Sequence, residues 1–299
     1  MLELDEKKIR KGKHIGLPYK GSKKQISKKI VEIIKQNFGT DKPIYDIFGG
    51  GGAITAECLI NGLDVHYNDL DRTITDMFQR VLATDREFLK TLIISRDEFF
   101  KIRDKENKTI DDELKLLVNS FRNDRNTYLY SKEFSDLKYN LAVEIIKKHG
   151  VFDGYKKTDT YKNAYRPFDV GKEKKHQVLE QFQRMQEVER VQKMSIKNLK
   201  ITNYDYTHFS YLTNTIIYLD PPYENTILKG YSIKEFNSQP FYDWAYEMSK
   251  KNIVLISSYE ISDERFECVY EFKKARIAYG YGPRGKRTEK LFMVKKGVK

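Results

Sequence analysis

The strongest chemical signal in the sequence is the tetrapeptide Asp220-Pro-Pro-Tyr223, which directly follows the apolar run 216–219. Two successive prolines fix the backbone and remove two amide donors, so we expect a rigid bend where the chain leaves a strand. Open α/β sheets place their active sites at the carboxyl ends of strands. The Asp220 carboxylate and the Pro221 carbonyl can each accept a hydrogen bond from an amino group, and Tyr223 offers a face for a planar ring. The segment, Pro222 included, therefore predicts a pocket for a flat heterocycle with an exocyclic amino group.

Such a pocket suits methylation of an aromatic amine such as N6 of adenine. The lone pair of that nitrogen is delocalised into the ring, and two acceptors would localise it for in-line attack on a sulfonium methyl group. This chemistry needs no metal and no covalent intermediate. The alternative is a purely structural Pro-Pro turn at the end of a strand, in which Asp220 caps the local backbone and Tyr223 packs at the rim of the core.

A second signal is the pattern Asp46-x-Phe48-x-Gly50-x-Gly52 at the end of an expected strand. Glycines let the backbone approach a ligand closely, and the following helix N-terminus can receive an anionic group. A generic glycine turn and a dinucleotide site are both alternatives, although the spacing is not that of the dinucleotide fingerprint.

Two acidic residues follow other expected strands. Asp69 could hold the ribose hydroxyls of an adenosine, although an aspartate at a strand end is usually a turn former. Asp205 stands beside Tyr206, and this pair could bind an adenine amino group and pack against the ring. Each of these patterns is weak by itself.

The elements that must position these residues form an α/β pattern. Apolar runs predict strands at 43–48, 63–67, 200–204, 215–219 and 252–258, and helical spacing predicts helices at 26–38, 53–58 and 241–248. The segments 268–272 and 291–295 suit an antiparallel hairpin with a basic tip at 284–287. Residues 83–197 show helical periodicity in pieces and no strong strand, which favours an inserted subdomain over a loop.

The amino-acid composition limits the classes of molecule that the protein is expected to bind. The 299 residues carry a formal net charge of +12, which would attract a polyanion, with nucleic acid as the first candidate and an ordinary basic protein as the alternative. The two cysteines stand in no zinc-binding pattern, and no apolar run approaches the roughly 20 residues that cross a bilayer. We expect a cytoplasmic protein without contact to a membrane. The first dozen residues alternate charges and predict an arm that orders late or on binding.

Taken together and in this order, the motifs resemble those of the Dam-type DNA adenine-N6 methyltransferases, the D12 class or alpha group. The resemblance rests on Tyr19-Lys-Gly-Ser-Lys23, Asp46-Ile-Phe-Gly-Gly-Gly-Gly52, Asn68-Asp69, Asp205-Tyr206 and Asp220-Pro-Pro-Tyr223. Ser22 departs from the commoner second glycine of the first motif, which leaves the backbone path there open.

The resemblance implies a Rossmann-like methyltransferase sheet, mostly parallel with an antiparallel C-terminal hairpin. The catalytic domain would comprise residues 1–82 and 198–299, and residues 83–197 would form an inserted, mainly helical target-recognition domain. The cofactor would be S-adenosyl-L-methionine, converted to S-adenosyl-L-homocysteine, with no metal. Residues expected to bind it are Tyr19, Lys23, Asp46, Phe48, Gly49, Gly50, Gly52, Asp69, Asp205 and Tyr206.

Double-stranded DNA would be the partner, and its target adenine would rotate out of the duplex onto Tyr223. Arg122, Asn123, Arg125 and Asn126 offer guanidinium and amide groups suited to base edges, although a polar loop explains them equally well. Lysines at 156–157 and 172–175 and the tip 284–287 are candidate phosphate contacts. We expect a monomer or weak dimer. A restriction-modification, phage or regulatory role stays open.

Three alternatives compete with DNA methylation. The same proline bend could serve an RNA adenine or a protein glutamine. The chain could also be an inactive DNA-binding protein that keeps the fold, although the intact Asp220, Tyr223 and glycine turn argue against that. A nicotinamide enzyme has little support.

Overall fold

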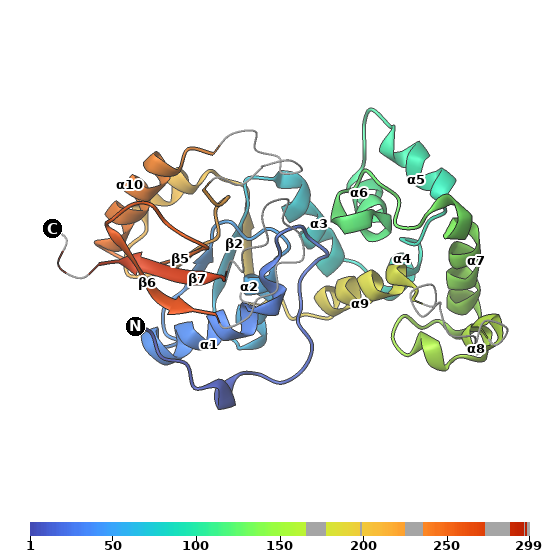
Figure 1. Ribbon diagram of the computed structural model, residues 1–299, viewed down its shortest axis with the longest axis horizontal. Coiled ribbons are helices and arrows are strands. Elements are labelled where there is room, and N and C mark those ends of the chain that lie inside the picture. Colours follow the sequence, from blue (N-terminus) through green and yellow to red (C-terminus); the bar gives the residue numbers. More distant parts are fainter. Residues whose placement is uncertain (166–177, 198, 225–235, 273–287, 296, 298–299) are drawn as a thin grey trace. The chain divides into compact units, whose positions relative to one another are not determined.

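A computed structural model of the chain describes residues 1–165, 178–197, 199–224, 236–272, 288–295 and 297 (Figure 1). The chain divides into two compact units. The first comprises Met1–Ile15, Ser22–Thr75 and Ser195–Lys299, and the second comprises Gly16–Gly21 and Asp76–Met194.

The first unit is built on a sheet whose described strands follow the order β3-β2-β1-β4-β5-β7-β6. The strands are β1 Ile44–Asp46, β2 Val65–Asn68, β3 Leu199–Thr202, β4 Ile216–Leu219, β5 Ile253–Ser258, β6 Phe266–Glu271 and β7 Lys290–Val294. Strands β1 to β5 are parallel to one another, whereas β7 is antiparallel to both β5 and β6. The expectation of a mostly parallel sheet with an antiparallel C-terminal hairpin is confirmed, and the tip of that hairpin lies outside the described residues.

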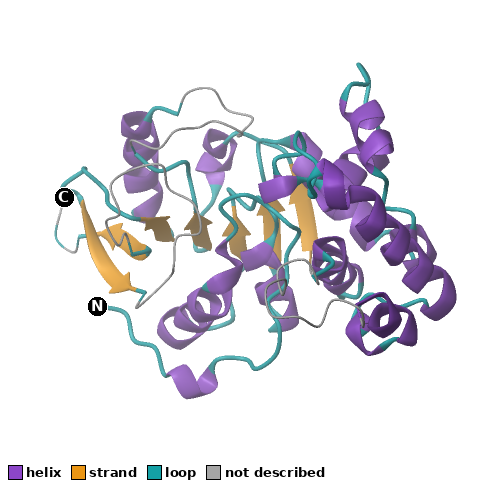
Figure 2. Cartoon of the chain, turned by 45° about the vertical axis from the view of Figure 1, so that its right-hand side comes forward, coloured by secondary structure: helices purple, strands orange, loops and turns teal. Residues whose placement is uncertain are grey.

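Helices cover both faces of this sheet (Figure 2). On one face α1 Ser27–Phe38 and α2 Ala53–Ile60 contribute to a core that contains Ile216 and Tyr218. On the other face α10 Ser238–Ser249 packs on Ile217 and Leu219. Strand β4 is therefore buried on both sides, because its successive side chains alternate between the two cores. A strand with no charged side chain and no exposed face gives the segment after it a fixed starting point.

The N-terminal arm is ordered in the structure without a bound partner, and the expectation that it orders late stays a prediction. The Leu2 amide donates to the Val269 carbonyl of β6, and the Asn37 side chain on α1 bonds to both backbone groups of Glu3. Farther along, Arg10 makes two hydrogen bonds of 2.8 and 2.9 Å to Glu57 on α2. The side chains of α1 and α2 thus supply partners for an extended backbone, which the composition of the arm itself does not reveal.

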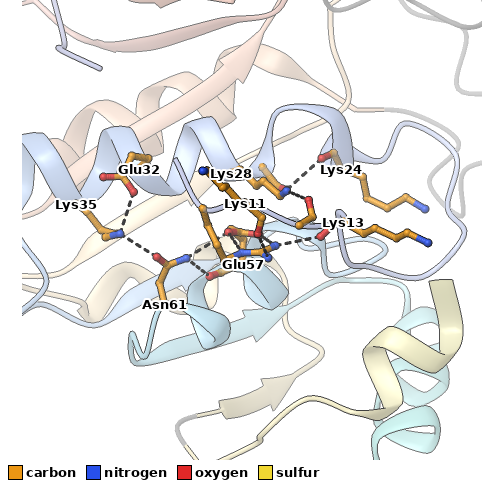
Figure 3. Close-up of polar contacts among 11 residues, drawn as sticks. Lys11, Lys13, Lys24, Lys28, Glu32, Lys35, Glu57 and Asn61 are labelled. Atoms are coloured by element: carbon orange, nitrogen blue, oxygen red, sulfur yellow. Dashed lines mark hydrogen bonds and ion pairs between the residues drawn. The ribbon is translucent and has the colours of Figure 1, made fainter. Parts of the chain in front are cut away.

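Glu57 is the centre of a polar cluster between the arm, α1 and α2 (Figure 3). Its side chain is 2% exposed and accepts hydrogen bonds from Arg10 and from the Asn61 side chain. Asn61 accepts in turn from Lys35, which is also paired with Glu32. The cluster ties the arm to the helix that follows the glycine turn.

The second unit is mainly helical in its described residues. It contains α4 Arg86–Lys90, α5 Arg96–Arg103, α6 Ile110–Asn119, α7 Lys132–His149, α8 Asp159–Tyr165 and α9 Glu180–Gln192, and α3 Arg72–Leu82 runs across the division of the sequence. The buried Asn119 side chain bonds to the backbone of Leu92 and Ile94 and accepts from Gln181. These bonds tie the end of α6 to the segment between α4 and α5 and to α9.

Among the residues that the structure describes, we find no helix long and apolar enough to cross a membrane.

Candidate active site

The glycine turn begins at a buried carboxyl group. Asp46 is 1% exposed, and its Oδ2 accepts hydrogen bonds from the backbone amide and the hydroxyl of Thr55 in the first turn of α2. Burial raises its pKa to about 7, against the effect of those two bonds. Asp46 thus fastens α2 to β1, and its expected contact with a cofactor stays a prediction.

Glycine is required in this turn for two reasons. A Cβ on Gly49 would lie 2.3 Å from ring atoms of Tyr67, so no side chain fits there. Gly50 and Gly52 have φ angles of 48° and 70°, in the left-handed region that other residues rarely adopt. The Tyr67 hydroxyl donates to the Gly50 carbonyl, which fixes the turn against β2.

Asn68, at the end of β2, joins three strands. Its side-chain amide donates to the carbonyls of Ile47 and Tyr204, and its Oδ1 accepts from the Thr202 hydroxyl and the Tyr204 amide. The residue is 1% exposed, so these bonds satisfy a fully buried amide. The sequence marked Asn68 only as the neighbour of Asp69, whereas the structure shows that it aligns the ends of β1, β2 and β3.

Asp69 lies beside the glycine turn. Its Oδ2 accepts from the Gly50 amide at 2.8 Å and its Oδ1 from the Asp71 amide. Burial raises its pKa to about 6, although both backbone bonds act in the opposite direction. Each carboxylate oxygen can accept more than one hydrogen bond, so these contacts leave capacity for the hydroxyl groups of a sugar.

Asp205 and Tyr206 follow β3, and their side chains lie in different environments. The Asp205 carboxylate is exposed and caps a short 3-10 helix by accepting from the Thr207 amide and hydroxyl. The Tyr206 ring stacks near Phe48, with centroids 6.1 Å apart, and meets the edge of Trp244. Phe48 and Tyr206 thus form one half-buried aromatic surface after β1 and β3.

The proline corner after β4 carries an ion pair. The Lys23 ammonium lies 2.8 Å from Asp220 Oδ1, and the Tyr223 hydroxyl lies 3.1 Å from the same oxygen. Burial raises the pKa of Asp220, while Lys23 acts to lower it. The pKa of Lys23 is raised, because the carboxylates of Asp220 and Glu289 outweigh the cost of burying its charge. The first and the last sequence motifs therefore meet at one carboxylate.

Sequence reasoning missed Glu289, the residue before β7. It is 8% exposed, and its Oε2 accepts from the Tyr223 hydroxyl at 2.7 Å. Its Oε1 lies 3.6 Å from the Lys23 ammonium. A lone glutamate between a basic segment and a strand gives no signal in the sequence, because its partners are far away along the chain.

The topology brings these groups to one edge of the sheet. Strands β1 and β4 are parallel neighbours in which Asp46 pairs with Tyr218, so the glycine turn and the proline corner leave the sheet side by side. Asp220 also acts electrostatically on both Asp46 and Asp69. The residues that come together here are Lys23, Asp46, Phe48, Gly49, Gly50, Gly52, Asp69, Tyr206, Asp220, Pro221, Pro222 and Tyr223. Tyr19 is grouped with the second unit, and its role stays a prediction.

The predicted base-reading residues lie in a tight loop of the second unit. Arg122, Asn123 and Arg125 all have φ angles between 53° and 59°, which non-glycine residues rarely adopt. Arg125 pairs with Glu113 at 3.0 Å, and Asn126 donates from its backbone to Asp124. Clustered backbone strain of this kind is more frequent at functional sites. Of the expected phosphate contacts, 156–157 form a described 3-10 turn, and 172–175 and 284–287 lie outside the described residues.

Comparison with known families decides what these motifs belong to. The family model of the D12 class N6 adenine-specific DNA methyltransferases matches residues 19–277. The chain belongs to this family. The match begins at the motif that contains Lys23 and includes the proline corner, whereas the N-terminal arm and Glu289 lie outside it.

Comparisons of this D12-class chain with curated proteins and with solved structures are less informative. No curated protein matches it. A presumed methylase from Haemophilus influenzae is 9% identical, with 89% of this chain and 86% of that chain covered and a TM-score of 0.33. A presumed methyltransferase from Escherichia coli is 11% identical, with 96% and 92% covered and a TM-score of 0.35. Scores of this size support no conclusion about the chain.

Proposed function

We propose that this D12-class chain transfers a methyl group from S-adenosyl-L-methionine to N6 of an adenine that is rotated out of duplex DNA. The observation that carries the proposal is the Lys23–Asp220 ion pair at the proline corner, on the strand next to the glycine turn. This ion pair keeps Asp220 ionised as a hydrogen-bond acceptor for an amino group, at the edge of the sheet where the cofactor would lie.

The proline corner would receive the adenine. Both described contacts of Asp220 fall on Oδ1, so Oδ2 is the oxygen we assign to the N6 amino group. The Pro221 carbonyl would accept the second N6 hydrogen, because proline directs its carbonyl without competing as a donor. The Tyr223 ring has the Lys23 ammonium 4.9 Å from its centroid and forms a T-shaped pair with Tyr259, and we assign stacking of the base to this ring.

The cofactor residues fit an adenosine with a methionine tail. Bound S-adenosyl-L-methionine supplies an electrophilic methyl group. Asp69 would accept from the ribose hydroxyls, and the turn at Gly50 and Gly52, whose left-handed φ angles favour glycine, would lie against the methionine tail. The aromatic surface of Phe48 and Tyr206 would pack against the adenine, and Asp205 would accept from its amino group.

The second unit, with 83–197 as its proposed bounds, would bind the DNA. The strained loop of Arg122, Asn123, Arg125 and Asn126 would read bases in the major groove, where guanidinium and amide groups distinguish base pairs. The net charge of +12 would add sequence-independent attraction to phosphates. Rotating a base out of the duplex costs on the order of a few kcal/mol, which stacking on Tyr223 would offset.

A parallel methylation assay tests the proposal. The protein is incubated with S-adenosyl-L-methionine labelled in the methyl group and with unmethylated duplex DNA, RNA or a mixed protein extract. We expect label in DNA as N6-methyladenine. Label in RNA or protein alone would favour the alternative substrates, and DNA binding without any label would favour an inactive binding protein.

The variant Asp220→Ala separates chemistry from binding. Loss of methylation with retained DNA affinity is expected, because the phosphate contacts lie elsewhere. Asp220→Asn is the matched control, since its amide keeps one acceptor and the shape of the side chain. Loss of DNA binding by a folded Asp220→Ala protein would contradict this division of roles.

A further inference from the structure

Glu289 completes a chain of hydrogen-bonding groups that starts at the proposed target amine. Tyr223 lies between the two carboxyl groups, with its hydroxyl 3.1 Å from Asp220 Oδ1 and 2.7 Å from Glu289 Oε2. Glu289 is held in place by the hairpin, because its carbonyl accepts from the Phe272 amide at 2.9 Å. A hydroxyl between two carboxyl oxygens at these distances can donate to one while it accepts from the other.

Among the residues that the structure describes, the charges around this chain do not cancel. One ammonium, that of Lys23, lies 2.8 Å from Asp220 but 3.6 Å from Glu289, so Asp220 has the closer cation. Burial raises the pKa of Glu289, and the nearby Asp220 raises it further, while Lys23 acts to lower it. The Lys23 ammonium therefore stabilises the negative charge of Asp220 more directly than that of Glu289.

We propose that Glu289 accepts, through the Tyr223 hydroxyl, the proton that the target amine loses during methylation. The inference rests on the proposed function and concerns the fate of one proton that this function must release. Glu289 touches neither base nor cofactor in this scheme and acts through Tyr223.

Methyl transfer followed by the proton relay conserves atoms and charge. The amine nitrogen takes the methyl group from the sulfonium, whose carbon–sulfur bond breaks with its electron pair remaining on sulfur. One N6 proton passes to Asp220 as the new bond forms, because positive charge on a nitrogen conjugated with the ring is costly. The neutral Asp220 carboxyl then rotates about its Cβ–Cγ bond, which brings the protonated Oδ2 to the side of Tyr223 that Oδ1 occupied, and it passes that proton to the Tyr223 oxygen while the Tyr223 hydroxyl proton moves to Glu289. The products are a neutral methylamine, a neutral thioether and a protonated Glu289, which later releases its proton to water.

Other titratable groups face this cluster and shape its response to pH. Tyr218 projects from β4, and Tyr259 follows β5. The pKa of Tyr218 is raised by burial and by Asp220, so this phenol stays protonated at the pH of the assay. Lys23 stays charged because its pKa is raised. Asp220 and Glu289 then titrate on the acid side, as do Asp46 and Asp69, whose pKa values of about 7 and about 6 are raised by burial and also by the charge of Asp220.

The test is Glu289→Gln, measured under single-turnover conditions with enzyme in excess over unmethylated duplex DNA. The amide still accepts from Tyr223 but cannot take a proton. We expect the rate to fall about 10- to 100-fold, with the apparent affinities for DNA and cofactor changed by less than about threefold. The acid limb that Glu289 gives the wild-type profile should disappear. Glu260→Gln is the matched control, because Glu260 is 78% exposed and also lies near β7 through Lys290.

Two further measurements test whether Tyr223 and Glu289 act in one relay. Tyr223→Phe should slow the reaction as much as Glu289→Gln, and the double variant should be no slower than either, because both break one relay. An infrared titration of the protein without substrates should show a protonated carboxyl band in the wild type that Glu289→Gln lacks. A Glu289→Gln rate equal to wild type, a slower rate with an unchanged pH profile, or additive effects in the double variant would each overturn the relay.

The wild-type protein distinguishes failure of the relay from failure of the proposed function. If it forms no N6-methyladenine, the proposed function fails. If it methylates DNA normally and Glu289→Gln does the same, only the relay fails. Circular dichroism of each variant checks the fold, and Glu289→Asp, which keeps an acid, should restore part of the rate and the acid limb.

Discussion

The ammonium of Lys23 lies 2.8 Å from Oδ1 of Asp220, so a residue of the first motif sets the charge of a residue in the last. Both side chains are largely buried, with 9% and 16% of their surface exposed. A buried carboxylate keeps its charge only with such a partner. The hydrogen-bond acceptor proposed for the target amine therefore depends on a segment that precedes the first strand.

Replacing Lys23 by Met should shift the pH dependence of methylation. Burial raises the pKa of Asp220 and Lys23 opposes that rise, so without the ammonium the pKa of Asp220 increases further. The acid limb of the rate profile should move upward by about 1–3 pH units, and activity should recover partly at high pH. Single-turnover rates at saturating cofactor measure this shift. Lys251→Met, an exposed lysine before β5, is the control, and an unmoved acid limb would remove Lys23 from this role.

Gly49→Ala should destabilise the first unit. The added methyl group would lie 2.3 Å from the Tyr67 ring, which is buried and also anchors the Gly50 carbonyl. We expect a loss of about 2–3 kcal/mol in the free energy of unfolding, together with loss of cofactor binding. Gly62→Ala is the matched control, because nothing lies within 4 Å of its Cβ and only its φ of +73° is strained. Equal losses in the two variants, followed by thermal unfolding, would argue against close packing at Gly49.

Asp69 should make cofactor affinity depend on pH. Its pKa is raised to about 6 by burial, so the carboxyl takes up a proton as the pH falls through that value and loses its capacity to accept from ribose hydroxyls. Calorimetry should show affinity falling between pH 7.5 and pH 5, approaching about tenfold per unit at the acid end. Asp69→Asn should bind weakly at every pH. Asp69→Ala should weaken cofactor binding more than turnover at saturation, and the opposite order would exclude the ribose role.

Arg10→Ala should destabilise the protein because it leaves Glu57 without its cation. Glu57 is 2% exposed and Arg10 is 25% exposed, so the loss should be below that of a fully buried pair, about 2 kcal/mol. Adding Glu57→Gln should restore part of the stability, since the amide carries no charge. Lys11→Ala, an exposed neighbour in the arm, is the control. A double variant that is less stable than Arg10→Ala would show that the charge of Glu57 is not the cause.

The sequence was sufficient to predict the sheet and the groups at its carboxyl edge. Apolar runs such as 216–219 locate strands, and a parallel βαβ unit must place Asp46 and Asp69 at the same edge. The antiparallel hairpin was predicted as well, although the position of β7 between β5 and β6 was not. Strand order depends on which surfaces pack together, and local periodicity does not carry that information.

Contacts between distant polar residues could not be predicted. The Lys23–Asp220 pair, the place of Glu289 and the four bonds of Asn68 all join segments that are far apart along the chain. The pairing of Arg125 with Glu113, only 12 residues apart, was not predicted either, because it depends on the path of the strained loop. Residue types and spacing indicate which side chains can take part in chemistry, but three-dimensional partners determine their charge.

The bond from the Leu2 amide to the Val269 carbonyl has a practical consequence for anyone who shortens the chain. Strand β6 is the outermost strand on its side of the sheet, and Leu2 and Leu4 pack against the adjoining core. An unprotected outer strand pairs readily with other molecules. A version that starts at Gly16 would still contain every family motif, yet we expect it to self-associate and precipitate at concentrations where the full chain stays dispersed.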